Sequence, residues 1–162
     1  MSGRGDISVL FVCLGNICRS PTAHGVFEKM VQDAGLQDRI RIDSAGTGAW
    51  HVGESPDKRA TAAAARRGYP LDHLRARQAT AGDFSRFDYV LAMDRGNYRD
   101  LENLRQEGSS AQLQLFLEYA ARFDEREVPD PYYGGADGFD HVLDLVEDAA
   151  GGLLSHIRER HL

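Results

Sequence analysis

The sequence predicts an α/β protein, a single three-layer domain in which helices cover both faces of a parallel sheet. Short apolar segments typical of buried strands alternate with longer segments of helical spacing, which is the pattern of a parallel sheet. The 162 residues suffice for one domain with a substantial core, and no linker or internal repeat divides them. We therefore expect residues 1–162 to form one domain.

The N-terminal part of the chain supplies two strands and the helix between them. Residues 9–12 form an apolar run that ends at Cys13 and is too short for a free-standing helix. Residues 21–34 carry apolar side chains on one helical face, and Gly35 favours a stop there. Residues 39–45 alternate apolar and polar side chains and are expected to form the second strand.

The rest of the chain continues the alternation. Helices are expected over residues 57–67, 95–106 and 139–160. Strands are expected over residues 88–93 and 112–117, although the second of these also fits a helix. Residues 124–135 are acidic and then rich in Pro, Tyr and Gly, which indicates a loop. Four strands with a site at the first strand–helix turn indicate a doubly wound sheet in the flavodoxin-like order 2-1-3-4.

That first turn carries the chemistry. Cys13 ends the strand, Gly15 and Asn16 tolerate a tight backbone turn, and Arg19 precedes the helix start at Pro21. Successive N–H groups that lead into a helix N-terminus form an anion-binding nest. The guanidinium adds a fork for two phosphate oxygens, and the positive surroundings favour the thiolate. The turn therefore predicts a phosphate cradle with a nucleophilic sulfur at its floor.

Each of these residues alone also fits a structural role, because buried free cysteines are common and arginines usually lie at the surface. The order of strand, Cys13, Gly-Asn, Arg19 and helix start favours the catalytic interpretation. Formation of a cysteinyl phosphate needs a leaving group that can be protonated as it departs, so a carboxylic acid should lie near the cradle. Asp130, held between two prolines, is our candidate, although an Asp-Pro pair is also typical of a turn.

Composition and charge narrow the classes of binding partner that we expect for the chain. The net charge of −6 without a basic stripe argues against nucleic acid. We find neither the apolar core of a signal peptide nor a run long enough to span a membrane, so no membrane partner is expected. Both cysteines lie in one loop, unlike a disulfide scaffold, so we expect a reducing cytoplasm. The six histidines lack zinc-site spacing, and neither metal nor cofactor is expected.

The chain resembles the low molecular weight protein tyrosine phosphatases. The matching motifs are VCLGNICRSP at 12–21, DSAGT at 43–47, ARQ at 76–78, MD at 93–94 and DPYYG at 130–134. They occur in the family's order and spacing over nearly the whole chain. The resemblance implies hydrolysis of phosphotyrosine on proteins, with phosphate or other oxyanions also binding in the active site.

The resemblance also implies roles for individual residues. Cys13 attacks phosphorus, Arg19 binds the phosphoryl oxygens, and Asp130 is the general acid and base. The substrate-binding set is Leu14, Gly15, Asn16, Ile17, Cys18, Arg19, Ser20, Trp50, Tyr132 and Tyr133. Asn16, Ser20 and Ser44 support the loop, and Cys13 and Cys18 form a reversible protective disulfide.

Two positions bear on how far the properties of the family apply to this chain. Ile17 stands where relatives that prefer phosphoarginine carry Thr, which favours an aryl phosphate here. Leu74 stands where many relatives carry a His that braces the loop, and His73 is displaced by one position.

Two other interpretations compete with a tyrosine phosphatase. A thiol-dependent arsenate reductase of the same fold relays oxidation to further cysteines, but the chain has none after Cys18. A non-catalytic phosphoprotein-binding module would lack the nucleophile or the acid, whereas Cys13, Arg19 and Asp130 are all present.

Overall fold

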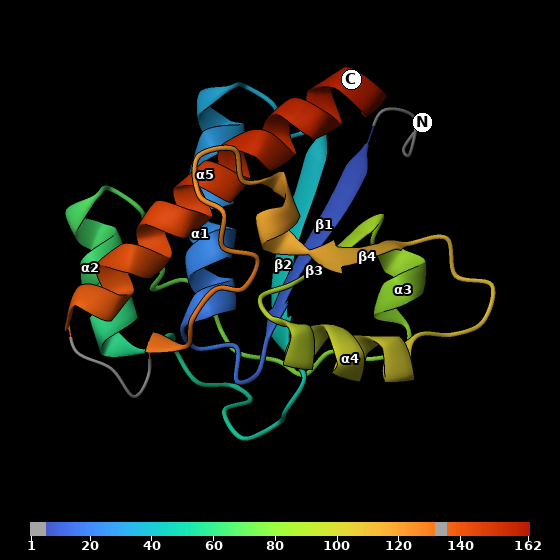
Figure 1. Cartoon of the computed structure of the whole chain (residues 1–162), viewed down its shortest axis with the longest axis horizontal. Coiled ribbons are helices and arrows are strands. Elements are labelled where there is room, and N and C mark those ends of the chain that lie inside the picture. Colours follow the sequence, from blue (N-terminus) through green and yellow to red (C-terminus); the bar gives the residue numbers. More distant parts are fainter. Residues whose placement is uncertain (1–5, 132–135) are drawn as a thin grey trace.

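The computed structural model describes residues 6–131 and 136–162, which are built around a four-stranded parallel sheet (Figure 1). The strands are β1 (Ile7–Cys13), β2 (Ile40–Gly46), β3 (Tyr89–Ala92) and β4 (Gln112–Leu115). Their order is β2-β1-β3-β4, so the predicted fold class and strand order are confirmed. Cys13 pairs with Gly46 and Val12 with Ala92, which brings the carboxyl ends of three strands together.

Helices and strands alternate as predicted, and the structure differs from the prediction at α3 (Asp83–Arg86) and at the end of β4. They are α1 (Arg19–Asp33), α2 (Lys58–Arg66), α3 (Asp83–Arg86), α4 (Arg95–Leu104), the 3₁₀ helix η1 (Phe116–Tyr119) and α5 (Ala136–His161). The four-residue α3 was not predicted, because one turn is too short to show a helical period. The strand predicted over residues 112–117 ends at Leu115, because Phe116 and Leu117 already belong to the 3₁₀ helix η1.

Alternate residues of β1 belong to two separate cores. Val9 and Phe11 pack with α1 and α5, while Leu10 and Val12 pack toward α4 on the opposite face (Figure 1). The Phe11 ring makes edge contacts with aromatic rings of α1 and η1, at centroid distances of 5.7 and 5.0 Å. Burial on both faces explains why β1 is an apolar run rather than an alternating one.

This packing fixes the place of the turn between β1 and α1. Because β1 is the second strand of four and fully covered, its carboxyl end opens between the loops that follow β2 and β3. Ligand sites of doubly wound sheets form at this edge. Within the described residues, no helix combines the length and the apolar character needed to cross a membrane.

Candidate active site

Residues 13–20, here called the nucleophile loop, curl tightly against the end of β2. Asn16 adopts a left-handed conformation with φ of 58°, which Asn tolerates better than most residues. A Cβ atom on Gly46 would lie 2.7 Å from the carbonyl oxygen of Leu14, so β2 must end in glycine for the loop to approach. The curl turns the backbone N–H of Asn16 toward Cys13 Sγ, at 3.2 Å.

The Cys13 sulfur is held by polar groups rather than packed among aliphatic side chains alone. Ser20 Oγ lies 3.0 Å from Cys13 Sγ, and the Asn16 side-chain amide donates to Ser20 Oγ at 2.8 Å. Cys13 is buried, yet it lines a cavity. The sulfur therefore has hydrogen-bond donors around it and an open side.

Arg19 lies at the first position of α1 and is oriented by three groups. Its Nη1 donates to Asp94 Oδ2 at 2.6 Å and to the Val128 carbonyl at 3.1 Å, and its Nη2 lies 3.7 Å from Asp130 Oδ2. Burial by itself would lower the pKa of Arg19, but attraction to Cys13, Asp94 and Asp130 outweighs it, so the pKa is raised. The guanidinium stays charged beside the sulfur.

Asp94 is a site residue to which the sequence analysis gave no role. Its Oδ1 accepts the backbone N–H of Asn97 at 2.7 Å and so caps α4, while its Oδ2 orients Arg19. An aspartate directly after a buried strand, at a helix start and on the same sheet edge as Cys13, was the signal available in the sequence. One carboxylate thus ties two elements to the cradle.

The loop, Asp130 and Trp50 surround one cavity of about 420 Å³. It is lined by Cys13, Leu14, Gly15, Ile17, Cys18, Arg19, Trp50, His51 and Asp130. The structure therefore brings the three predicted catalytic residues together, although Asp130 lies 111 residues from Arg19 in the sequence. Trp50 is 71% exposed and lies at the cavity's edge. His51, another residue without a predicted role, is bonded through Nδ1 to Glu54 at 3.0 Å.

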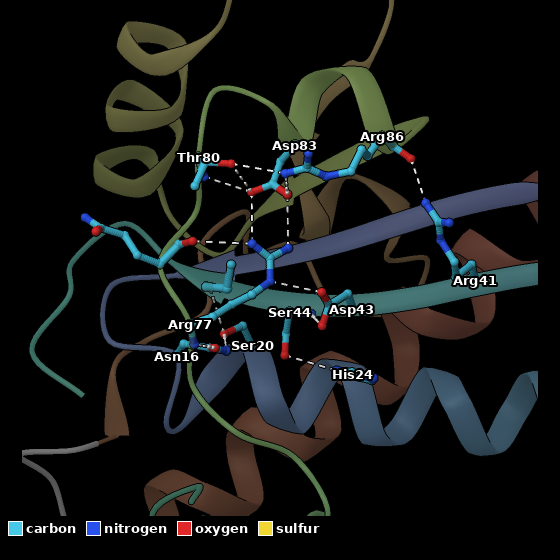
Figure 2. Close-up of polar contacts among 12 residues, drawn as sticks. Asn16, Ser20, His24, Arg41, Asp43, Ser44, Arg77, Thr80, Asp83 and Arg86 are labelled. Atoms are coloured by element: carbon cyan, nitrogen blue, oxygen red, sulfur yellow. Dashed lines mark hydrogen bonds and ion pairs between the residues drawn. The ribbon is translucent and has the colours of Figure 1, made fainter. Parts of the chain in front are cut away.

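The remaining predicted residues are placed less directly. Asn16 and Ser20 do not line the cavity and act behind it, through their bonds to Cys13 and to each other. Ser44 Oγ bonds to His24 Nδ1 at 3.0 Å, on the α1 side of β2 (Figure 2). His73 is bonded to Glu28 at the surface. Tyr132 and Tyr133 lie outside the described residues.

The two cysteines have different surroundings. Burial, followed by the nearby charges of Asp57, Cys13 and Asp130, raises the pKa of Cys18 to about 12. Cys18 therefore stays protonated, which leaves Cys13 as the candidate nucleophile. Both cysteines are free thiols in this structure, and the disulfide between them stays a prediction.

Cavity size alone does not locate the site. A larger cavity of about 730 Å³ lies at the opposite end of β1 and β2 and is lined mostly by surface polar side chains. Neither cysteine lines it. Within the described ranges, no three His, Cys, Asp or Glu side chains are grouped as a metal ion would require.

A parallel sheet with Cys13, Arg19 and Asp130 around one cavity at its first strand–helix turn is the arrangement expected of an α/β enzyme that uses a thiol on phosphate esters. The family model for low molecular weight phosphotyrosine protein phosphatase matches residues 8–161. The chain belongs to this family, as its motifs predicted, and is a protein-tyrosine phosphatase.

Individual relatives agree with this assignment. A low molecular weight protein-tyrosine-phosphatase of Streptomyces coelicolor is 50% identical over 155 residues, covering 94% of each chain. A crystal structure of the Entamoeba histolytica protein tyrosine phosphatase with Hepes in the active site superposes with a TM-score of 0.92, at 39% identity, over 97% of this chain and 100% of that one. A structure described as a Drosophila arginine phosphatase superposes with a TM-score of 0.85, at 34% identity, over 91% of this chain and 96% of that one.

Proposed function

We propose that the chain, as one domain over residues 1–162, hydrolyses phosphotyrosine on proteins through a covalent cysteinyl phosphate. The observation that carries the proposal is the shared cavity of Cys13, Arg19 and Asp130. We expect phosphate and other oxyanions to bind in the same cavity. A catalytic thiolate needs reducing surroundings, which favours the cytoplasm.

In the first step the Cys13 thiolate attacks phosphorus, and the bond from phosphorus to the phenolic oxygen breaks. Asp130 gives its proton to that oxygen, so tyrosine leaves as a neutral phenol. Arg19 and the loop N–H groups bind the equatorial oxygens, where negative charge must be stabilised as the transition state forms. The positions of Asp94 and of the Val128 carbonyl support this role, because they hold the guanidinium at the cradle.

In the second step Asp130, now a carboxylate, removes a proton from water, and the water oxygen attacks phosphorus. The sulfur–phosphorus bond breaks, which restores the thiolate and releases phosphate. The side chain of Asp130 is 35% exposed, so water can reach it.

The depth of the cavity favours an aryl phosphate. Cys13 is 2% exposed at the floor, whereas Trp50 stands at the edge. A phosphotyrosine is long enough to reach the sulfur, and a phosphoserine is too short. Ile17, which lines the cavity, supports phosphotyrosine over phosphoarginine by the resemblance described above.

The test is a steady-state comparison of one peptide that carries phosphotyrosine, phosphoserine or phosphoarginine at the same position, with a chelator present. We expect kcat/KM to be highest for phosphotyrosine, by at least about tenfold, because a misplaced phosphorus atom loses the benefit of orientation. Equal turnover of the phosphoserine peptide would contradict the proposal, and a preference for phosphoarginine would reassign the substrate.

A further inference from the structure

A short segment after α2 runs along the edge of the sheet and reaches the nucleophile loop from behind. The backbone N–H of Gly46 donates to the Arg77 carbonyl at 2.8 Å, and the N–H of Ala79 donates to the Gly46 carbonyl at 2.7 Å. Gln78 pairs with Gly46 as a parallel bridge. Residues 76–79, here called the edge segment, are thus attached to the end of β2.

The side chain of Arg77 fastens the edge segment to two carboxylates (Figure 2). Its Nε donates to Asp43 Oδ2 at 3.0 Å, and its two terminal nitrogens donate to the two oxygens of Asp83, both at 3.1 Å. The side chain of Asp83 is 2% exposed. Burial alone would raise the pKa of Asp83, but the Arg77 fork and the Thr80 N–H outweigh it and the pKa is lowered. The bidentate pair is therefore a charged and geometrically specific attachment.

The main chain of Arg77 sets the orientation of a side chain in the nucleophile loop. Its N–H donates to Asn16 Oδ1 at 3.0 Å. Because a donor at this place requires the amide oxygen to face it, the Asn16 Nδ2 is turned to Ser20 Oγ, at 2.8 Å. Without the Arg77 N–H, these contacts would not determine whether the oxygen or the nitrogen of the Asn16 side-chain amide faces Ser20.

The orientation of Asn16 in turn sets the direction of the Ser20 hydroxyl. Since Ser20 Oγ accepts from Asn16, its own hydrogen is left for another acceptor. Two acceptors are in reach, Cys13 Sγ at 3.0 Å and the Ala45 carbonyl at 3.4 Å. The shorter distance and the negative charge of a thiolate favour the sulfur.

We propose that Arg77 is a positioning residue for the hydrolysis: through its main-chain N–H, Asn16 and Ser20, it directs a hydroxyl hydrogen at the Cys13 thiolate. The proposal rests on the proposed nucleophilic role of Cys13. It assigns the two carboxylates that hold the Arg77 side chain, Asp43 of β2 and Asp83 of α3, a part in setting the reactivity of a sulfur that they do not touch.

The test is Arg77→Lys, which keeps the positive charge but removes the rigid fork. The looser edge segment is expected to let the Arg77 N–H move away from Asn16, which costs the thiolate its hydrogen bond from Ser20. Loss of that one bond predicts that kcat falls about tenfold, with KM for the phosphotyrosine peptide nearly unchanged. The pH profile of Cys13 alkylation by iodoacetamide, followed by peptide mass mapping to separate it from Cys18, reports the thiolate without turnover. Its midpoint is expected to rise by about one pH unit.

Arg67→Lys is the matched control. The side chain of Arg67 is 28% exposed against 33% for Arg77, and it also pairs with carboxylates, Asp144 at 3.0 Å and Glu147 at 2.9 Å. It joins the end of α2 to α5 instead of contacting the loop. We expect a comparable loss of thermal stability in this variant, with kcat and the alkylation midpoint unchanged.

The proposal is overturned if the alkylation midpoint of Arg77→Lys is the same as that of Arg67→Lys. If Arg77→Lys fails to fold, Asp43→Asn gives the answer, because it weakens one of the three bonds from Arg77 to carboxylates and leaves the Asp83 pair intact. Removal of a negative charge alone would lower the midpoint, whereas loosened positioning raises it, so a lowered or unmoved midpoint counts against the proposal.

Failure of the proposed function is distinguished by Cys13→Ser in the same turnover assay. Undiminished hydrolysis by that variant would reject Cys13 as the nucleophile, whatever the alkylation profiles show. Loss of hydrolysis, combined with unmoved profiles in the Arg77 and Asp43 variants, would keep the function and reject the positioning role.

Discussion

The nucleophile loop and residues 124–131, here called the acid segment, face the same cavity but are held in different ways. The buried side chains of the loop itself, Asn16 and Ser20 among them, form a continuous hydrogen-bonded set with Cys13. The acid segment is anchored at buried Val128, whose N–H donates to Met93 and whose carbonyl accepts from Arg19. Its other described attachments include ion pairs of Glu125 and Glu127 with side chains more than 40% exposed.

This difference corresponds to two chemical tasks, nucleophilic attack by the loop and proton transfer by the acid segment. A sulfur that must meet phosphorus in line gains from a fixed position, because small displacements of a reacting atom are costly. An acid must exchange protons with both the leaving group and water, so a more solvated position suits it. Buried networks fix geometry, whereas exposed ion pairs contribute little, on the order of 0–1 kcal/mol each. We therefore expect changes in the loop to affect every substrate and changes in the acid segment to discriminate between leaving groups.

The largest effect is expected for Cys13→Ser, which removes the nucleophile and leaves the cradle. Hydrolysis of aryl phosphates should fall on the order of 10⁴-fold or more, by analogy with other nucleophile deletions. Binding of inorganic phosphate should persist, because the loop N–H groups and Arg19 remain. Turnover assays and calorimetric titration measure the two quantities.

Cys18→Ser is the control for that variant. The pKa of Cys18 is raised to about 12, so its thiol carries no nucleophilic charge, and most activity should remain. If Cys18→Ser lost as much activity as Cys13→Ser, the two cysteines would not have the separate roles that their surroundings indicate.

A smaller and more selective effect is expected for Asp130→Ala. Removing a general acid typically costs on the order of 10²–10⁴-fold, and the cost falls for phenols that leave without a proton. Rates for a series of aryl phosphates should therefore depend much more steeply on the acidity of the phenol in the variant. Asp124→Ala, an exposed carboxylate of the same segment, should leave the series unchanged. Equal slowing of every ester by Asp130→Ala would remove the acid role.

The smallest effect is expected for Asp148→Ala, which acts on the approach to the acid segment. Asp148 of α5 accepts the backbone N–H groups of Ala121, Arg122 and Phe123 at 2.9 to 3.1 Å. Without it we expect esters of poor leaving groups to slow by about threefold, with little change for good ones, and the melting temperature to fall by roughly 3 °C. Asp144→Ala on the same helix, whose carboxylate bonds to Arg67, is the control for the leaving-group dependence.

The stabilisation by Asp148 should also depend on pH. Burial would raise the pKa of Asp148, but the three N–H bonds outweigh it and the folded-state pKa is lowered. The contribution is therefore complete above the ordinary carboxyl pKa and lost as the pH falls through the lowered value. The melting temperatures of wild type and Asp148→Ala should converge in acid, and a constant difference would contradict this account.

Much of the molecule follows from local sequence. The four strands and the turn from Cys13 to Pro21 were predicted, because each depends on burial periodicity or on residues adjacent in the chain. The strand order was predicted from the fold class and not from any local pattern. The misjudged end of β4 shows the limit of periodicity, since Phe116 and Leu117 continue the apolar pattern of the strand but belong to the 3₁₀ helix η1. Asp130 was singled out by its prolines, but only the fold places it within 3.7 Å of Arg19.

By itself the sequence determined the sulfur, the guanidinium and the strand–turn–helix that presents them, because a βα turn is built from contiguous residues whose conformational preferences are local. The tertiary structure decided which carboxylate orients Arg19, which cysteine stays protonated, and that Arg77 reaches the loop from the edge of the sheet. Those facts depend on distances between segments separated by tens of residues. Such distances are set by the packing of helices on the sheet rather than by any local pattern.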